Sequence, residues 1–361
     1  MPRLGTDDVR RVRARRAAAQ LLSGPGGSTP AQIVERLLAV QAQDLRAARL
    51  ALRARGKGLT AADVNRALSA EGSLTVGWLC RGTLHLVGRD DYLWLLALTA
   101  PLQAARSRRR LGQEGVSADA ADSAVAVIDE ALAAEGPLGR PELAERIAAR
   151  GIRTEGQATP LLLNLAAIRG VAVLGPVRDG RQLFALARDW LGAAPPPVLV
   201  GDERATALAE LARRYLAGHG PATAADLAGW VGLPLRDARA GLRAIGGELV
   251  ELGGELVELA GRTRTPGRLP ARLLPAFDPY LLGWRDRSFA VPPAHARRVH
   301  PGGGIVRATA TVDGVAAGTW SARRRGDDVR VEVEPFAALA PGAARALRAE
   351  AWDVERFESL R

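Results

Sequence analysis

The chain has 361 residues, enough for about two to four domains that each bury a hydrophobic core. Its hydrophobic content of 47% and mean hydropathy of −0.02 are typical of a soluble globular protein. The net charge of +11 favours an acidic partner, namely nucleic acid, an anionic membrane or an acidic protein.

Several classes of chemistry are disfavoured by residue types that the chain nearly lacks. Lys57 is the only lysine, so a Schiff-base mechanism has this residue or the N-terminal amine and nothing else. One cysteine, Cys80, and four scattered histidines argue against a disulfide framework and a metal site, and we expect no cofactor. The first residues lack the apolar stretch of a signal peptide, and no apolar run is long enough to span a bilayer. We therefore expect a cytoplasmic protein without a membrane partner.

The first third of the chain predicts four helices, a hairpin and a further helix. The helices cover residues 6–22, 28–41, 45–55 and 64–70. Thr60-Ala-Ala-Asp63 has the pattern of a capping box at the start of the fourth helix. Strand formers over 74–78 and 82–87 predict a hairpin, and a strongly apolar helix follows over 90–100. Short helices followed by a hairpin are typical of a winged helix.

The same layout returns twice. Gly136-Pro137 and Gly220-Pro221 each precede a predicted helix, and Leu143-Ala144 and Leu227-Ala228 follow them at a constant offset. Each copy then has a second helix and a two-stranded hairpin, the first of which turns at 178–181. This internal repeat predicts three tandem winged-helix domains. We expect them over residues 1–115, 116–192 and 198–262, with a proline-rich linker at 193–197.

After residue 262 the sequence pattern predicts short strands and turns in place of helices. Strands are predicted over 302–312, 315–320 and 329–333, and a last helix over 341–357. We expect residues 263–361 to form a barrel-like β domain with the helix laid across it. The predicted fold class is thus mainly α with β: three winged helices and a C-terminal β domain.

Two glutamines, Gln41 and Gln43, follow an amphipathic segment that has no structural need of them. On a helix, residues two apart point about 200° away from each other, so both amides can face one site only if the backbone leaves the helix. The alternative is a helix end whose polar residues face solvent. Two neutral amides can hold a water or a base edge, but they cannot act as a strong base or nucleophile.

Other candidate residues are few. Asp44 is the only carboxylate next to the glutamines that could act as a base, and His85 on a predicted strand is more easily read as a core histidine. Arg323, Arg324 and Arg325 lie at a predicted hairpin tip, where they grip phosphates or form a solvated turn. A second basic run at 106–110 is read as a phosphate contact or a solvated helix end.

Four segments in order resemble the AlkZ/YcaQ family of bacterial DNA glycosylases. They are Gln41-Ala-Gln43-Asp44, Trp78–Val87, Leu273–Arg287, and Gly302–Arg307 with Asp313-Gly314 and Gly318-Thr-Trp320. The resemblance covers essentially the whole chain, and its motif of two glutamines around an apolar residue is that of the AlkZ branch. The matching segments also contain Arg81, Arg285 and Arg287, which we expect to contact DNA together with the three arginines of the hairpin.

The family resemblance implies hydrolysis of the N-glycosidic bond of N7-alkylated guanine, including unhooking of interstrand cross-links. It also implies self-resistance to a DNA-alkylating natural product. The chemistry of the residues agrees, because a cationic N7-alkylguanine is already a good leaving group. What remains is to position a water and to stabilise charge, for which Gln41 and Gln43 suffice as catalytic residues.

We expect a monomer that acts on double-stranded DNA carrying alkylated purines, without a lyase step. Aromatic residues are scarce, at 4%, so we also expect an open cleft in which an adduct is reached without full extrusion of the base. The alternative is a non-catalytic winged-helix DNA-binding protein, such as a regulator or a resistance factor. Tandem fused winged helices disfavour a regulator of palindromic operators, which usually binds as a symmetric dimer.

Overall fold

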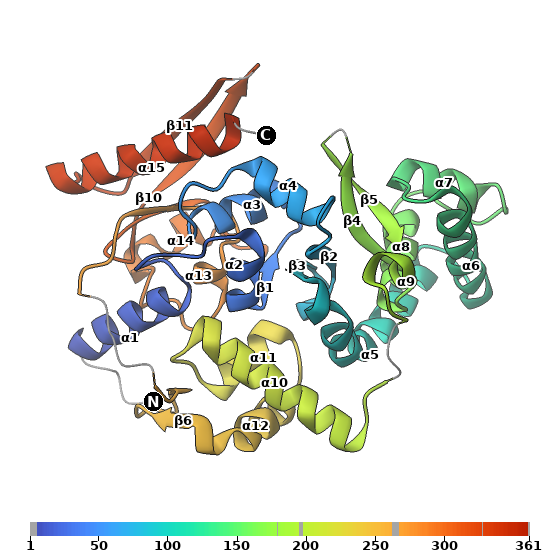
Figure 1. Ribbon diagram of the computed structural model, residues 1–361, viewed down its shortest axis with the longest axis horizontal. Helices are drawn as coiled ribbons and strands as arrows, with labels where there is room; N and C mark the ends of the chain where they lie inside the picture. Colours follow the sequence, from blue (N-terminus) through green and yellow to red (C-terminus); the bar gives the residue numbers. More distant parts are fainter. Residues whose placement is uncertain (1–5, 179, 195–197, 262–266, 327, 360–361) are drawn as a thin grey trace. The chain divides into compact units, whose positions relative to one another are not determined.

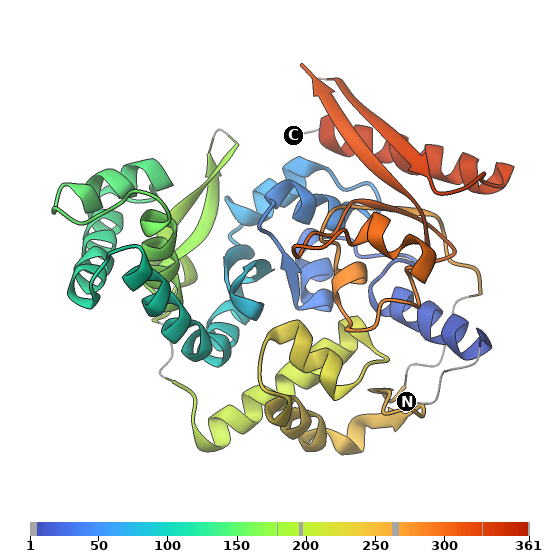
Figure 2. The same cartoon turned by 180° about the vertical axis from the view of Figure 1, so that it is seen from behind.

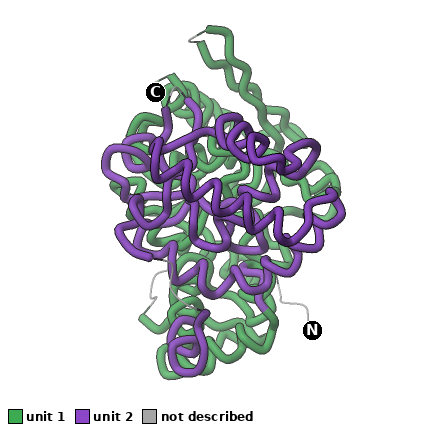
Figure 3. Tube along the Cα trace, turned by 90° about the vertical axis from the view of Figure 1, so that its right-hand side faces the viewer, with its two compact units in different colours: residues 1–64, 208–230, 234–361 green, residues 65–207, 231–233 purple. Residues whose placement is uncertain are grey.

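The computed structural model describes residues 6–178, 180–194, 198–261, 267–326 and 328–359. The chain is a mixed α and β structure in which helices predominate (Figures 1 and 2). Its packing separates two compact units (Figure 3). Unit 1 comprises Met1–Val64, Leu208–Trp230 and Pro234–Arg361, and unit 2 comprises Asn65–Ala207 and Val231–Leu233.

The elements have the following bounds. The helices are α1 (Thr6–Ala19), α2 (Pro30–Leu37), α3 (Leu45–Arg53), α4 (Ala61–Leu68), α5 (Arg89–Gln113), α6 (Ala118–Glu135), α7 (Arg140–Ala148), α8 (Ala158–Ile168), α9 (Ala187–Leu191), α10 (Gly201–His219), α11 (Ala224–Val231), α12 (Leu235–Ala244), α13 (Pro279–Leu282), α14 (Ala296–Val299) and α15 (Pro341–Ser359). The strands are β1 (Ala39–Gln41), β2 (Leu74–Trp78), β3 (Leu84–Gly88), β4 (Ala172–Arg178), β5 (Arg181–Leu186), β6 (Leu249–Glu251), β7 (Val257–Leu259), β8 (Arg272–Leu274), β9 (Thr309–Val312), β10 (Val315–Arg325) and β11 (Asp328–Pro335).

Helix α2 ends earlier than the sequence predicts. Thr29 caps its start by accepting a hydrogen bond from the backbone N–H of Gln32 at 3.2 Å. At Leu38 the backbone has a φ of 66° and a ψ of −48°, which a right-handed helix cannot continue. The chain then runs on as β1, so the helix predicted to reach Gln41 stops at Leu37.

Two hairpins of unit 2 share an antiparallel sheet. Strand β2 pairs with β3 and β4 pairs with β5, as predicted, and Val76 of β2 pairs with Leu174 of β4. Their order is β3-β2-β4-β5. Helix α5 follows β3 and continues past Pro101 to Gln113, although the sequence predicts an end at Ala100. A proline removes one helical hydrogen bond, and here the helix tolerates that loss.

The two aligned Gly-Pro segments occupy corresponding places. After α6, Leu138 exchanges a pair of backbone hydrogen bonds of 2.8 and 3.0 Å with Phe184 of β5. After α10, Ala222 exchanges two such bonds of 3.0 Å with Val257 of β7. In both regions three helices are followed by a hairpin, and the segment between the first two helices pairs with the second strand of that hairpin.

The C-terminal sheet is antiparallel, in the order β11-β10-β9-β8, and α15 packs against β11 (Figure 1). The indole N–H of Trp320 donates to the carbonyl of Leu274 at 2.7 Å and joins β10 to β8. Among the described residues the order is linear, with β8 and β11 at its edges, so the sheet is open and not closed into a barrel. Instead β10 continues beyond its pairing with β9 and forms a long two-stranded ribbon with β11.

A fully buried ion pair fixes the segment that surrounds α13. The two terminal nitrogens of Arg55 donate to the two carboxylate oxygens of Asp278 at 2.9 and 2.8 Å, and both side chains are 0% exposed. Arg55 also donates to Gln20, and Asp278 caps α13 by accepting from the backbone N–H of Tyr280 at 2.8 Å. The bidentate pair therefore joins the residues after α3 to the start of α13. The bond to Gln20 adds the residues after α1.

Candidate active site

The Gln41–Gln43 segment leaves the helix that precedes it. Helix α2 ends at Leu37, Gln41 closes β1, and Gln43 lies in a bend two residues later. The amide Nε2 of Gln41 donates to Oε1 of Gln43 at 2.8 Å. Ala42 between them is only 3% exposed, while Gln43 is exposed and Gln41 is half-buried. The backbone thus departs from the helix, which was the condition for both amides to face one site.

Asp44 caps helix α3. Its Oδ1 accepts hydrogen bonds from the backbone N–H groups of Arg46 at 2.9 Å and Ala47 at 3.3 Å. This bond pattern is that of an N-cap residue, which satisfies N–H groups that have no partner within the helix. The carboxylate that sequence reasoning considered as a base therefore has a structural task beside the glutamine pair.

A cluster of charges that sequence reasoning did not find lies at the same end of α3. The Nε of Arg46 donates to Glu358 of α15 at 2.9 Å, although 312 residues separate the two. Arg324 of β10 donates to the backbone carbonyl of Glu358 at 2.8 Å, and its guanidinium lies 3.7 Å from the Glu358 carboxylate. One local signal was available in the sequence: Arg46 lies in the first turn of its helix and Glu358 in the last, where charges of their sign are unfavourable.

Two candidate residues, His85 and Arg81, belong to unit 2. His85 on β3 is 2% exposed, and its Nδ1 donates to the carbonyl of Thr83 at 2.9 Å. Burial, and then the nearby charge of Arg81, lower the pKa of His85 to about 3, so the ring is neutral at pH 7. The preferred interpretation of His85 as a core histidine is confirmed. Arg81 lies in a 3₁₀ turn with a φ of 56° and is half-buried, and burial lowers its pKa.

Arg285 and Arg287 follow α13 in unit 1. Arg285 is exposed, and its backbone N–H donates to Asp226 of α11 at 2.9 Å, which fixes the loop while leaving the guanidinium in solvent. Arg287 is half-buried, with Nη1 3.4 Å from Nδ1 of His300. Desolvation and the charge of Arg287 lower the pKa of His300. Of the two arginines, Arg285 is the better placed to meet a phosphate.

The three arginines at the end of β10 lie on two opposite faces of the β10–β11 ribbon. Arg323 and Arg325 are exposed, whereas Arg324, on the opposite face, is half-buried against Glu358. Arg323 lies directly opposite Arg330 of β11, which is also exposed. Like charges directly opposite each other destabilise a strand pair, so this face is better suited to binding an anion than to stabilising the ribbon.

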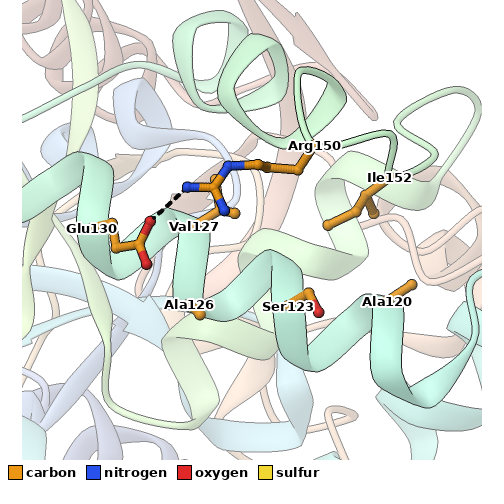
Figure 4. A pocket seen from close by; sticks show the side chains of 7 residues that line it. All are labelled: Ala120, Ser123, Ala126, Val127, Glu130, Arg150 and Ile152. Carbon is orange, nitrogen blue, oxygen red and sulfur yellow. Dashed lines mark hydrogen bonds and ion pairs between the residues drawn. The ribbon is translucent and has the colours of Figure 1, made fainter.

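An open pocket in unit 2 contains none of the predicted site residues (Figure 4). An exposed ion pair of 3.0 Å between Glu130 and Arg150 crosses it. Its lining residues are Ala120, Ser123, Ala126, Val127, Glu130, Arg150 and Ile152. Within the described part of the chain, no group of three His, Cys, Asp or Glu side chains could hold a metal ion. None of the helices, over those same residues, is long and apolar enough to cross a membrane.

Comparison with known proteins places this geometry in a family. A relative from Streptomyces sahachiroi, an interstrand DNA cross-link repair glycosylase, is 29% identical over 370 residues, which cover 97% of this chain and 96% of the relative. The solved structure of the Streptomyces sahachiroi DNA glycosylase AlkZ is similar with a TM-score of 0.76 and 26% identity, over 97% of this chain and 96% of that one. The family model described as DNA glycosylase AlkZ-like matches residues 34–357, a range that includes both glutamines and Glu350 to Phe357 of α15. The chain therefore belongs to the AlkZ-like family of DNA glycosylases.

Proposed function

We propose that this glycosylase hydrolyses the N-glycosidic bond of N7-alkylated guanine in duplex DNA. The observation that carries the proposal is the hydrogen-bonded amide pair formed by half-buried Gln41 at the end of β1 and exposed Gln43 in the bend that follows. Among the described residues, the carboxylate next to the pair in sequence is that of Asp44, which already accepts two backbone N–H groups as the cap of α3. Such a site suits a substrate whose base is already a good leaving group, and N7-alkylguanine carries a positive charge that makes it one.

The amide pair supplies positioning. Because Gln41 donates to Oε1 of Gln43, the carbonyl oxygen of Gln43 is held beside Gln41. A carbonyl oxygen has two lone pairs, so the second can accept a hydrogen bond from a water and direct the water's own lone pair at the sugar. As the water oxygen bonds to C1′, the glycosidic electron pair moves onto the base, which leaves neutral, and the water loses its proton to solvent.

This arrangement also gives lesion selectivity. An unmodified guanine leaves as an anion unless an acid protonates it, and the neutral amides of Gln41 and Gln43 cannot supply that proton. Two neutral amides stabilise the developing charge on the sugar without changing the leaving group. The family's glycosylase activity is therefore directed to cationic adducts in this member.

DNA binding is assigned to the repeated helix-and-hairpin regions and the C-terminal ribbon. We propose that residues 1–115, 116–192 and 198–262 act as three winged helices, supported by the corresponding Leu138–Phe184 and Ala222–Val257 pairings. The exposed arginines Arg323, Arg325 and Arg330 contact phosphates. Exposed Arg285 adds a further contact, and half-buried Arg81 and Arg287 add weaker ones. The enzyme acts as a monomer.

Cross-linked DNA falls within the proposed substrate range. The relative at 29% identity carries a name that states interstrand cross-link repair, and Gln43 is exposed rather than enclosed in a pocket. An exposed amide can reach a bulky adduct that a snug base-flipping pocket excludes, so we propose that the base is not fully extruded. Self-resistance to a DNA-alkylating natural product is the corresponding biological role. The family assignment favours this enzyme over a non-catalytic DNA-binding protein.

The proposal is tested by base release from defined duplexes. Purified enzyme in excess is mixed with duplex DNA containing one N7-methylguanine, and free 7-methylguanine is quantified beside an unmodified control. Release from the alkylated duplex alone is expected. Equal release of unmodified guanine, or no release from N7-methylguanine and from an N7-linked interstrand cross-link, would overturn the proposal.

A further inference from the structure

Glu358 connects two elements that both carry proposed functional residues. Its side chain is 7% exposed, yet it accepts from Arg46 in the first turn of α3 at 2.9 Å. Its backbone carbonyl accepts from Arg324 of the ribbon at 2.8 Å, and its carboxylate lies 3.7 Å from the same guanidinium. The last turn of α15 thus joins α3, the helix that follows Gln43, to the end of β10 that carries Arg323, Arg324 and Arg325.

The placement of these charges opposes the helix dipoles. A cation in the first turn of α3 and an anion in the last turn of α15 each lie at the unfavourable end of their helix. Two other acidic residues of α15 also reach α3, since Glu350 and Asp353 both pair with Arg53, but they lie within the helix rather than in its last turn. Local conflicts of this kind are expected at functional sites rather than at purely structural ones.

Arg46 also keeps part of its guanidinium at the surface. Two guanidinium groups share the Glu358 carboxylate, and the side chain of Arg46 is still 45% exposed. The backbone N–H of Arg46 donates to Asp44, the residue directly after Gln43, so Arg46 starts at the same helix end as the amide pair. A half-exposed guanidinium held on one side by a carboxylate can present its remaining donors to a phosphate.

We propose that Glu358 is a positioning residue that holds Arg46 against the DNA backbone beside the damaged nucleotide. It also fixes Arg324, so that the neighbouring Arg323 and Arg325 face away from α15 and toward DNA. Arg46 is then a phosphate-binding residue next to the glutamines, and Glu358 aligns the ribbon with the catalytic segment. This inference rests on the proposed function of the Gln41–Gln43 pair.

Charge and position can be separated with three variants. Glu358→Gln raises the net charge by one, so electrostatics alone predicts equal or tighter DNA binding. A positioning role predicts in addition that single-turnover base release falls by about tenfold or more, because Arg46 and Arg324 lose their fixed orientation. Asp353→Asn makes the same charge change on the same helix and should leave base release unchanged. Thermal unfolding of each variant shows whether it folds.

Arg46→Gln tests the proposed phosphate contact directly. Arg46 is the more exposed member of its pair with Glu358, so this substitution is the less disturbing of the two for folding. The slope of log Kd against log salt concentration should become shallower by about one. An unchanged slope, or base release by Glu358→Gln equal to that of Asp353→Asn, would overturn the inference while leaving the proposed function intact. If the wild type released no base, the proposed function would fail, and the salt dependence of DNA binding would still decide the role of Arg46.

Discussion

Two of the ion pairs in unit 1 that join an arginine in or just after α3 to a distant carboxylate, Arg55–Asp278 and Arg46–Glu358, differ in what surrounds them. Arg55 and Asp278 are both 0% exposed, and every oxygen of the carboxylate has a partner. Arg46 is 45% exposed, and its partner Glu358 shares its carboxylate with Arg324. The first pair has no donor that solvent or DNA can reach, whereas the second retains donors at the surface. The same chemistry therefore holds the fold together in one place and is available for binding in the other.

Burial determines the cost of breaking each pair. Removing one member of a buried pair leaves a charge without compensation in a medium that solvates it poorly. At the surface, solvent screens the remaining charge, and little stability is lost. Substitution of Arg55 should therefore lower the free energy of unfolding. Substitution of Arg46 or of the ribbon arginines should instead change DNA binding.

The largest effect is expected at the buried pair. Arg55→Met leaves Asp278 without its partner at a site that is 0% exposed and should cost about 3–5 kcal/mol in the free energy of unfolding. Urea denaturation measures this loss, and Arg46→Gln provides the comparison, with an expected loss below about 1 kcal/mol. Equal losses at the two positions would contradict the distinction between them.

A pH-dependent effect is expected from His85, a second enclosed group. Its folded pKa of about 3 lies below its ordinary value of 6.5, so the unfolded chain binds the extra proton between these values. The stability contributed by neutral His85 is fully present above pH 6.5 and is lost as pH falls toward 3, by about 2 kcal/mol at pH 5. Urea denaturation at pH 7 and pH 5 should show this loss in the wild type and a smaller one in His85→Asn. An identical pH dependence in both proteins would refute the assignment.

A smaller effect is expected at Asp44. Asp44→Ala removes the cap of α3 and should cost about 1 kcal/mol in the free energy of unfolding, measured by urea denaturation. Asn caps helices as well as Asp does, so Asp44→Asn should keep both stability and base release. If Asp44→Asn were stable but inactive, Asp44 would be the catalytic base and the glutamines would not suffice.

The smallest effect on the free protein is expected at the ribbon. Arg323→Gln/Arg325→Gln should leave the thermal midpoint unchanged or slightly raised, because Arg323 faces Arg330 across the strands. In this double variant the slope of log Kd against log salt concentration should become shallower by about two. The exposed pair Arg345 and Arg348 of α15 offers a control with the same change in charge. Equal losses in the two double variants would show that net charge, rather than the ribbon, governs binding.

Local signals explain which parts of the structure could be predicted. Strand formers around a turn predicted the β2–β3 and β4–β5 hairpins, and the capping box at Thr60 is present with bonds of 2.7–3.2 Å to and from Asp63. The left-handed backbone at Leu38 had no such signal, because leucine rarely adopts a positive φ. The predicted helix over 28–41 is therefore four residues too long, although the backbone leaves the helix before the two glutamines.

Long-range contacts explain the rest. The Arg46–Glu358 pair joins residues 312 positions apart, and no periodicity or turn pattern links them. The pattern predicts a barrel-like β domain, but strand formers alone do not determine whether its edge strands meet. In the described sheet β10 extends along β11 instead, which creates the ribbon and the place where Arg324 meets α15.

The central claim is that two hydrogen-bonded amides carry out the chemistry without a strong base. The most direct test is the single-turnover rate of 7-methylguanine release at saturating enzyme for the wild type, Gln41→Ala, Gln43→Ala and the double variant. Each single variant should lose about 10²–10³-fold in rate with little change in DNA affinity, and the double variant should lose little more, because the amides act as one unit. A double variant that released base at the wild-type rate would contradict the claim and place the active site elsewhere.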